Sequence, residues 1–233
     1  MRFRVTVALA LAAMLIAVIP TSGAAGGSQE WFFLDDPYGG TAANDGTSHS
    51  IDGIMSTTTP GGPLEGEWIG GIWSTSLTAW WYAENPAAAD VTFGAGTWNV
   101  NLWYFNTFGP GTLHAEVFSV ADDGTSGLPL AAGETSILGG MALFTDETIS
   151  LAADVKTVPA GNRLALRLWF VPDELIAGMI VFYNGPDWLS SLESPSTDPG
   201  YPLPEATAAL LLGGGLAALA GYLALDRRRK ANN

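Results

Sequence analysis

The fold of this chain is decided by residues 97–105, which read TWNVNLWYF. Neighbouring side chains of a β-strand point to opposite faces, so residues two apart share a face. One face would then carry Trp98, Val100, Leu102 and Tyr104, and the opposite face Asn99, Asn101, Trp103 and Phe105. The alternation predicts a strand with one face buried in a core and the other partly solvated.

A second stretch, residues 163–170, alternates in the same way. It reads RLALRLWF, and its predicted buried face carries Leu164, Leu166, Leu168 and Phe170. Both stretches follow an Ala-Gly pair, at 95–96 and 160–161, where glycine would accept the positive φ of a turn. This likeness is typical of equivalent strands in the two halves of a jelly roll, with chance likeness between two strands as the alternative.

The rest of the chain favours the same fold class. Its 29 Gly and 14 Pro residues are scattered between short runs rich in Trp, Phe, Val, Ile and Thr, which is typical of an all-β sandwich or barrel. We therefore predict an all-β chain with a single β-sandwich that is jelly-roll-like. Its strands are expected near residues 31–34, 50–55, 67–73, 78–83, 90–93, 97–105, 113–120, 141–144, 148–152, 163–171 and 179–184.

The N-terminal residues 1–24 are expected to be a secretory signal peptide. Arg2 and Arg4 supply a positive start, a mostly apolar run follows, and small residues end the segment at Ala24. A retained N-terminal helix is the alternative.

The C-terminal part predicts a membrane anchor. Residues 206–225 carry no charge, and a helix of this length spans about 30 Å, the hydrocarbon thickness of a bilayer. The basic tail that follows would stop transfer on the cytoplasmic side; it consists of Arg227, Arg228, Arg229 and Lys230. The predicted domains are the signal peptide (1–24), a β-sandwich (25–192), a Pro/Gly/Ser-rich stalk (193–204) and a sorting signal (205–230).

The segment 202–230 resembles the C-terminal signal of PEP-CTERM surface proteins. The motif consists of Leu203, Pro204, Glu205, Ala206 and Thr207, where Ala206 stands in place of the second Pro of that family. The resemblance implies export to the cell surface and processing by a sortase-like enzyme, an exosortase or archaeosortase. A plain, uncut membrane anchor and attachment of the LPxTG type are the alternatives.

Charge and cysteine content exclude several classes of function. Between the two ends, three basic residues (Lys156, Arg163 and Arg167) stand against 21 acidic ones, which gives the domain a net charge of −18. Such a surface repels nucleic acid, so no nucleic-acid partner is expected. The chain has no Cys, which excludes disulfides and thiol catalysis.

Two kinds of binding site are considered. Exposed Trp and Tyr on a sandwich form platforms for sugar rings, with neighbouring amides that bind hydroxyls. The predicted glycan-binding residues are Trp81, Asn99, Asn101 and Trp103, and ordinary core packing is the alternative for each Trp. The acidic turn at Asp122 and Asp123 is a weak candidate for Ca²⁺, although Asp-Gly is also a common turn without an ion. No other cofactor is expected.

No catalytic motif stands out in the sequence. The only histidines are His49 and His114, and the sequence contains no Gly-x-Ser-x-Gly elbow, His-Glu-x-x-His helix or phosphate loop. We therefore expect a secreted, surface-anchored structural or interaction protein of the cell envelope or extracellular matrix, not an enzyme. The alternatives are a carbohydrate-binding module for extracellular polysaccharide and an exported glycosidase.

Overall fold

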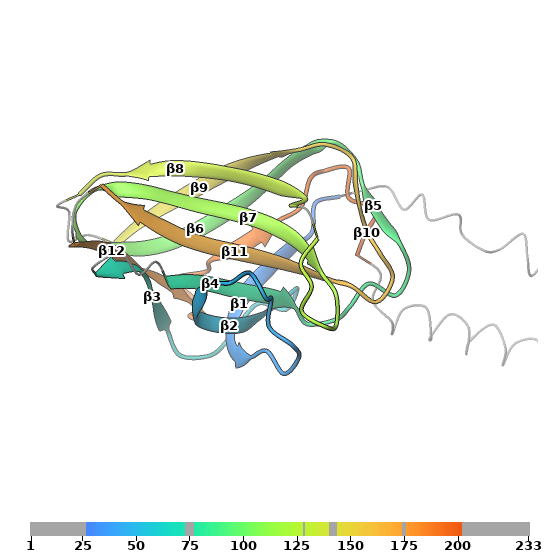
Figure 1. Ribbon diagram of the computed structural model, residues 1–233, viewed down its shortest axis with the longest axis horizontal. Coiled ribbons are helices and arrows are strands. Elements are labelled where there is room, and N and C mark those ends of the chain that lie inside the picture. The colour runs from blue at the N-terminus through green and yellow to red at the C-terminus, as the bar shows by residue number, and fades with distance from the viewer. Residues whose placement is uncertain (1–26, 73–76, 128, 140–143, 174–175, 202–233) are drawn as a thin grey trace, which may run out of the picture.

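The computed structural model describes residues 27–201, apart from 73–76, 128, 140–143 and 174–175, and its ribbon is drawn in Figure 1. The expected signal peptide, sorting motif, membrane helix and basic tail all lie outside these residues. Within them, no helix is long and apolar enough to cross a membrane.

The described secondary structure consists of thirteen strands, which confirms the all-β prediction. They are β1 (Glu30–Pro37), β2 (Ser48–Ser56), β3 (Glu65–Ile72), β4 (Leu77–Ala83), β5 (Val91–Phe93), β6 (Gly96–Phe108), β7 (Gly111–Val120), β8 (Ala131–Ile137), β9 (Phe144–Ala153), β10 (Lys156–Val158), β11 (Arg163–Pro172), β12 (Ile176–Tyr183) and β13 (Ser191–Glu193).

Eleven of the strands form one sheet that closes on itself. Its order is β11-β7-β8-β9-β6-β12-β3-β4-β2-β1-β13, and the additional pairings β11–β4 and β6–β13 join strands that are distant in that order. The remaining strands, β5 and β10, form a separate two-stranded sheet. Most pairs are antiparallel, and β2 and β4 run parallel. Figure 1 shows the strands wrapping around a common interior.

The alternation of β6 and β11 is as predicted. In β6, Trp98, Val100 and Leu102 are at most 1% exposed, while Asn99, Asn101 and Trp103 are partly exposed. In β11, the predicted inward residues Leu164, Leu166, Leu168 and Phe170 are fully buried. Both inward faces belong to one large hydrophobic cluster, so hydrophobic burial on one face of each strand stabilises the closed sheet.

Three strands were not predicted, namely β8, β10 and β13. The β8 stretch reads AAGETSI, which has few large apolar residues, yet it pairs with β7 from Val117↔Ala131 to Gly111↔Ile137. The three-residue β13 pairs with both β1 and β6. These strands exist because neighbouring strands offer their backbone groups, which for β10 and β13 come from strands distant in sequence, and a single-sequence pattern does not contain that information.

Part of the segment predicted to be a stalk, residues 193–204, packs against the folded domain. Asp198 is fully buried and Tyr201 is 4% exposed, and Tyr201 packs edge-on against Trp31 with ring centroids 6.2 Å apart. The Gln29 backbone N–H donates to Ser194 Oγ at 2.8 Å. The folded domain therefore extends through Tyr201, beyond the boundary predicted near Leu192.

Candidate functional site

The candidate site is a polar cluster on the outer face of strands β2, β4 and β11. We call it the His49 cluster, and it consists of Asp45, Thr47, His49, Asp52, Thr78, Tyr82 and Arg167. Strand register brings these residues together, because His49 lies opposite Thr78, Asp52 opposite Trp80, and Trp80 opposite Arg167. Asp45 comes from the β1–β2 loop.

His49 lies between two carboxylates. Its Nδ1 is 2.8 Å from Asp52 Oδ1, and its Nε2 is 3.1 Å from Asp45 Oδ1. The imidazole side chain is 12% exposed. Each ring nitrogen therefore faces a carboxylate oxygen.

Asp45 is held as a carboxylate. Burial works against its charge, but hydrogen bonds from the Thr47 backbone, His49 and the Thr47 hydroxyl outweigh burial and lower its pKa. The positive charge of Arg167 acts in the same direction, with Arg167 Nη2 3.3 Å from Asp45 Oδ2.

Arg167 is enclosed by rings and carboxylates. Its Nη1 is 3.6 Å from Glu116 Oε2, and its guanidinium lies 4.6 Å from the ring centroid of Trp169 and 5.8 Å from that of Trp80. Planar guanidinium groups stack on aromatic faces in this way. Arg167 thus joins the β1–β2 loop to β7 and β11, and its charge is already paired.

The hydroxyl groups of the cluster do not meet a histidine. Thr47 Oγ1 donates to Asp45 and lies 2.8 Å from Thr78 Oγ1. Tyr82 donates its O–H to Asp52 Oδ1 at 3.1 Å and accepts from the Ala43 backbone N–H at 2.8 Å; burial raises its pKa. Among the described residues, no hydroxyl-to-imidazole hydrogen bond exists, so the nucleophile–base pair of a serine-type hydrolase is absent from this part of the chain.

The second histidine lies on the same outer face. His114 stacks on Trp169 with ring centroids 4.7 Å apart and an interplanar angle of 6°. Its Nδ1 is 3.1 Å from Glu134 Oε2. Since β4 and β11 separate His49 from His114 in the sheet order, the two rings do not form one site.

The calcium candidates form an ordinary turn. The Thr125 backbone N–H donates to Asp123 Oδ1 at 2.9 Å, and this bond lowers the pKa of Asp123. Gly124 has φ +81°, as a turn requires. Among the residues described, no group of three or more His, Asp or Glu side chains is placed to hold a metal ion. Calcium at Asp122 and Asp123 stays a prediction.

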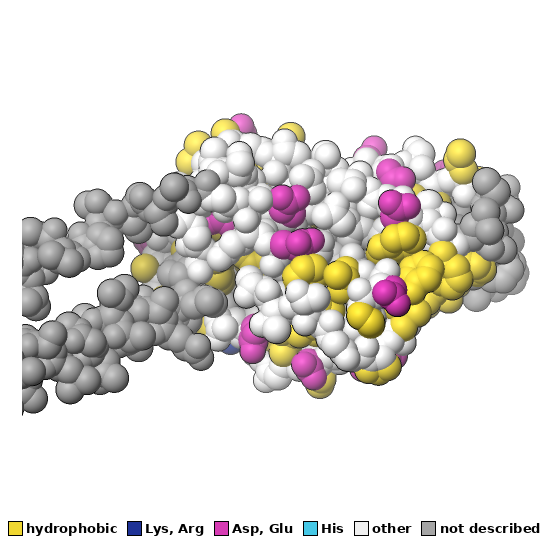
Figure 2. Space-filling view, turned by 180° about the vertical axis from the view of Figure 1, so that it is seen from behind, with side chains coloured by type: hydrophobic (Ala, Val, Ile, Leu, Met, Phe, Trp, Pro, Cys, Tyr) yellow, Lys and Arg dark blue, Asp and Glu magenta, His cyan; other side chains and the backbone are white. Residues whose placement is uncertain are grey.

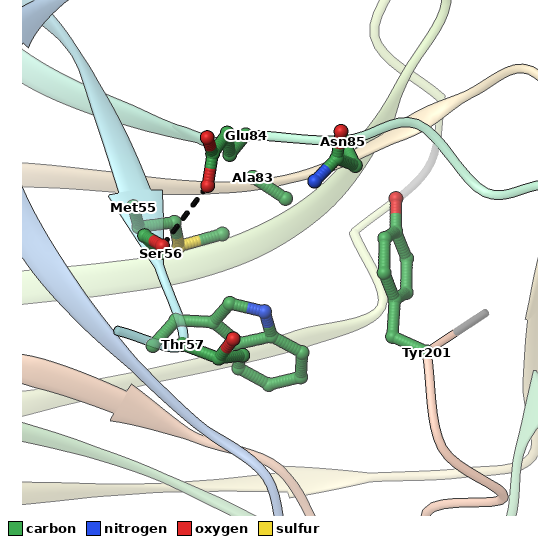
Figure 3. Close-up of a pocket in the computed structure, with 8 residues that line it drawn as sticks. Met55, Ser56, Thr57, Ala83, Glu84, Asn85 and Tyr201 are labelled. Atoms are coloured by element: carbon green, nitrogen blue, oxygen red, sulfur yellow. Dashed lines mark hydrogen bonds between the residues drawn. The ribbon is translucent and has the colours of Figure 1, made fainter. Parts of the chain in front are cut away.

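A pocket near the end of the described chain is too small for a large substrate. Its cavity volume is about 20 Å³, room for a single water molecule and far below the roughly 300–1,000 Å³ of typical ligand sites. Figure 3 shows Tyr201 and Asn85 on one side and Met55 and Ser56 on the other, with Ser56 Oγ donating to Glu84 at 3.0 Å. The aromatic walls, Trp31 and Tyr201, are almost fully buried.

The structure places three of the four predicted glycan-binding residues on one face and the fourth, Trp81, in the core. Trp81 is fully buried and stacks on Phe33 at 4.7 Å, so its ring offers no face to a ligand. Asn99 and Asn101 do share the outer face of β6 with Trp103, but their amide oxygens accept hydrogen bonds from Ser150 and Thr148. Trp103 packs edge-on against Trp188, with centroids 4.8 Å apart.

The residues of the His49 cluster were missed as a site. The sequence contains Asp45, His49 and Asp52 at spacings of four and three, but Asp45 and His49 fall between the strands expected at 31–34 and 50–55. The parallel pairing of β2 with β4 brings the loop next to β11. Two carboxylates close to one histidine in sequence are the signal that could have identified the cluster.

No protein-family model and no curated protein matches this chain. Solved structures do match its fold. A CocE/NonD family hydrolase from Staphylococcus aureus aligns with a TM-score of 0.54 and 9% identity, over 74% of this chain and 36% of the hydrolase. An aminopeptidase from a marine sediment Thaumarchaeota archaeon aligns with a TM-score of 0.52 and 9% identity, over 72% of this chain and 36% of the enzyme. The chain thus spans about a third of the length of these proteins.

These likenesses correct the function expected from the sequence. The chain shares its fold with about a third of each of two solved hydrolases, and this finding contradicts the prediction of a non-catalytic structural protein of the envelope. The prediction followed from the lack of catalytic motifs, and motif searches cannot detect a fold shared at 9% identity. The glycosidase alternative does not match either of these two enzymes.

Proposed function

We propose that this chain is the β-domain of a hydrolase that cleaves ester or amide bonds. The observation that carries the proposal is the alignment with about a third of a CocE/NonD hydrolase and of an aminopeptidase, both at TM-scores above 0.5. This is an argument from fold, and hydrolysis itself requires a site with a nucleophile or an activated water.

The nucleophile is proposed to come from a separate catalytic unit. In the described part of this chain, both nitrogens of His49 are engaged by carboxylates, and His114 contacts Glu134 and Trp169. The part of the two hydrolases that has no counterpart here, about two thirds of each, is long enough to hold a complete catalytic domain.

Activity measurements on the full-length chain test this proposal. An affinity-tagged chain is isolated from its native host in mild detergent and assayed with p-nitrophenyl butyrate and alanine p-nitroanilide. We expect ester- or amide-cleaving activity to co-elute with the tagged chain and to be carried by a second chain. Inhibition by a fluorophosphonate would indicate a serine nucleophile on that second chain, and inhibition by a metal chelator would indicate a metal-dependent site. The purified chain alone should show only background turnover. A preparation without any hydrolytic activity would overturn the proposal.

We further propose that the chain is exported and held at the cell surface, and that its closed sheet is of the jelly-roll type. The support for export is the apolar run of residues 5–19, the uncharged segment 206–225 and the basic tail. The PEP-CTERM-like motif at 203–207 supports processing by a sortase-like enzyme. Mass spectrometry of the mature C-terminus tests this: an end between 202 and 207 supports sorting, and an intact Asn233 contradicts it.

A further inference from the structure

An aromatic patch covers one end of the outer face of strands β6, β9 and β12. We define it by five residues, which are Trp103, Phe105, Phe144, Phe182 and Trp188. Register explains the grouping, because Trp103 lies opposite Phe182, and Phe105 lies opposite Phe144. The space-filling view from behind shows a continuous hydrophobic area toward one end of the molecule (Figure 2).

The patch is accessible to a partner. Phe144 is 50% exposed, and Leu64, which adjoins the patch at Gly185, is 42% exposed. The other four rings are partly exposed. A contiguous apolar area on a soluble domain marks an interaction surface, because leaving it in water costs free energy that docking recovers.

The rings interlock in a way that suits protein side chains. Trp103 and Trp188 meet at an interplanar angle of 77°, and Phe144 and Trp188 meet at 50°, with centroids 4.6 Å apart. Phe144 and Phe182 are tilted by 45°. A sugar ring stacks on a flat aromatic face, whereas the rings of this patch are tilted against one another and favour apolar side chains that pack between them.

Charge defines the chemistry of the partner. Two acidic residues flank the patch and are exposed, Asp146 opposite Trp103 in the register and Asp187 next to Trp188. The three described basic residues lie elsewhere, with Lys156 in β10 and both arginines in β11. A second copy of this chain would oppose like charges, whereas a partner with Lys or Arg around an apolar centre is complementary.

We propose that the aromatic patch is the docking surface for the catalytic unit of the hydrolase, which presents an apolar centre edged by Lys or Arg. This inference rests on the proposed function. It is supported by the apolar, acid-flanked surface and by the two thirds of each similar hydrolase that this chain does not contain. A stable contact of this kind buries about 800 Å² on each partner, with aromatic residues near its centre.

The test compares two single substitutions in the tagged full-length chain. Phe144→Asp places a charge in the patch, and Val155→Asp is the matched control, because Val155 is 62% exposed and lies beyond the end of β9, outside the patch. We expect Phe144→Asp to reduce the co-eluting ester- or amide-cleaving activity per mole of chain at least tenfold, and Val155→Asp to leave it unchanged. Raising KCl from about 50 to about 500 mM should weaken wild-type co-elution, because ion pairs around the patch are screened.

The outcomes separate the two proposals. If hydrolytic activity co-elutes equally with the wild type and with Phe144→Asp, the docking surface is wrong while the proposed function stands. If no hydrolytic activity co-elutes with the wild type, both proposals are wrong. Trp188→Ser repeats the test should Phe144→Asp lower the urea midpoint. Wild-type dimerisation in sedimentation that Phe144→Asp abolishes, or retardation of the wild type by a polysaccharide gel that Phe144→Asp abolishes, would also overturn the inference.

Discussion

At the residue scale, the fold depends on single side chains that join distant segments. Asp45 is the clearest case, since one carboxylate accepts from Thr47, contacts His49 and pairs with Arg167. These contacts attach the β1–β2 loop to the outer face of β11. The network is largely shielded, with the Asp45 side chain 9% exposed, so its ionic contacts are stronger than those of an exposed pair.

The pKa of Asp45 predicts how its contribution changes with pH. A carboxyl whose folded pKa lies below the unfolded value stabilises the fold above the unfolded pKa, here near 3.8, and loses this contribution as pH falls through the folded value. Asp45→Asn should therefore lower the free energy of unfolding by about 1–3 kcal/mol at neutral pH, and the difference from wild type should shrink below pH 3.8.

Urea unfolding at about pH 7 and about pH 2.5 measures this effect. Asp122→Asn is the control, because Asp122 is exposed in a turn. This substitution should leave the free energy of unfolding unchanged at both values of pH. An Asp45→Asn deficit that is equally large in acid would show that packing, not charge, is responsible.

At the element scale, the two Ala-Gly turns differ although their sequences are alike. Strand β5 precedes β6 and β10 precedes β11, and β5 pairs with β10. Gly161 has φ +85°, as predicted, with no atom within 4 Å of an added Cβ. Gly96 is not in the positive-φ region, and its added Cβ would lie 2.7 Å from Pro195 Cβ. Gly161 is therefore required by its positive φ, and Gly96 by the close approach of Pro195.

Gly161→Ala should lower the free energy of unfolding by about 1–2 kcal/mol, the cost of a left-handed conformation for an L-residue. Gly161→Asn should cost less, because Asn tolerates this region. Thermal unfolding of the two variants side by side measures the difference. Equal losses would mean that contacts of the new side chain, and not the φ angle, set the cost.

The buried face of β6 gives a second prediction at this scale. Leu102 is 1% exposed in the main core, so Leu102→Ala should lower the free energy of unfolding by about 2–5 kcal/mol through lost burial and a cavity. Asn101→Ala, on the outer face of the same strand, should cost less than about 1 kcal/mol, the usual net value of one exposed hydrogen bond. Urea denaturation of both variants tests the assignment of faces, which reversed costs would contradict.

At the scale of the whole molecule, the last described residue closes the core. Tyr201 packs against Trp31, accepts from the Leu164 backbone N–H at 3.2 Å and donates to the Asn162 carbonyl at 3.2 Å. Burial raises the pKa of Tyr201 to about 12, so its hydroxyl stays a donor at neutral pH. The two ends of the described chain are thereby held on the same core.

Tyr201→Ala should lower the free energy of unfolding by about 3–5 kcal/mol, since an aromatic ring leaves the core. Tyr201→Phe keeps the ring and should cost only about 1–3 kcal/mol, because the buried Leu164 N–H loses its acceptor. Urea midpoints of the full-length variants measure both changes. If Tyr201→Ala were neutral, residues 193–201 would act as the stalk that the sequence predicts.

The sequence by itself determined the all-β class and the buried faces of β6 and β11, because hydrophobic alternation with a period of two is a local property of a strand. Its acidic composition and the absence of Cys are equally local facts. Only the tertiary structure decided the closure of the sheet through β11–β4 and β6–β13, the existence of β8 and β13, and the meeting of Asp45 with Arg167. It also decided which rings are buried, as with Trp81, and which lie outside, as with Phe144. These features depend on backbone pairing and packing between residues far apart in the chain, and those contacts form only once the chain has folded.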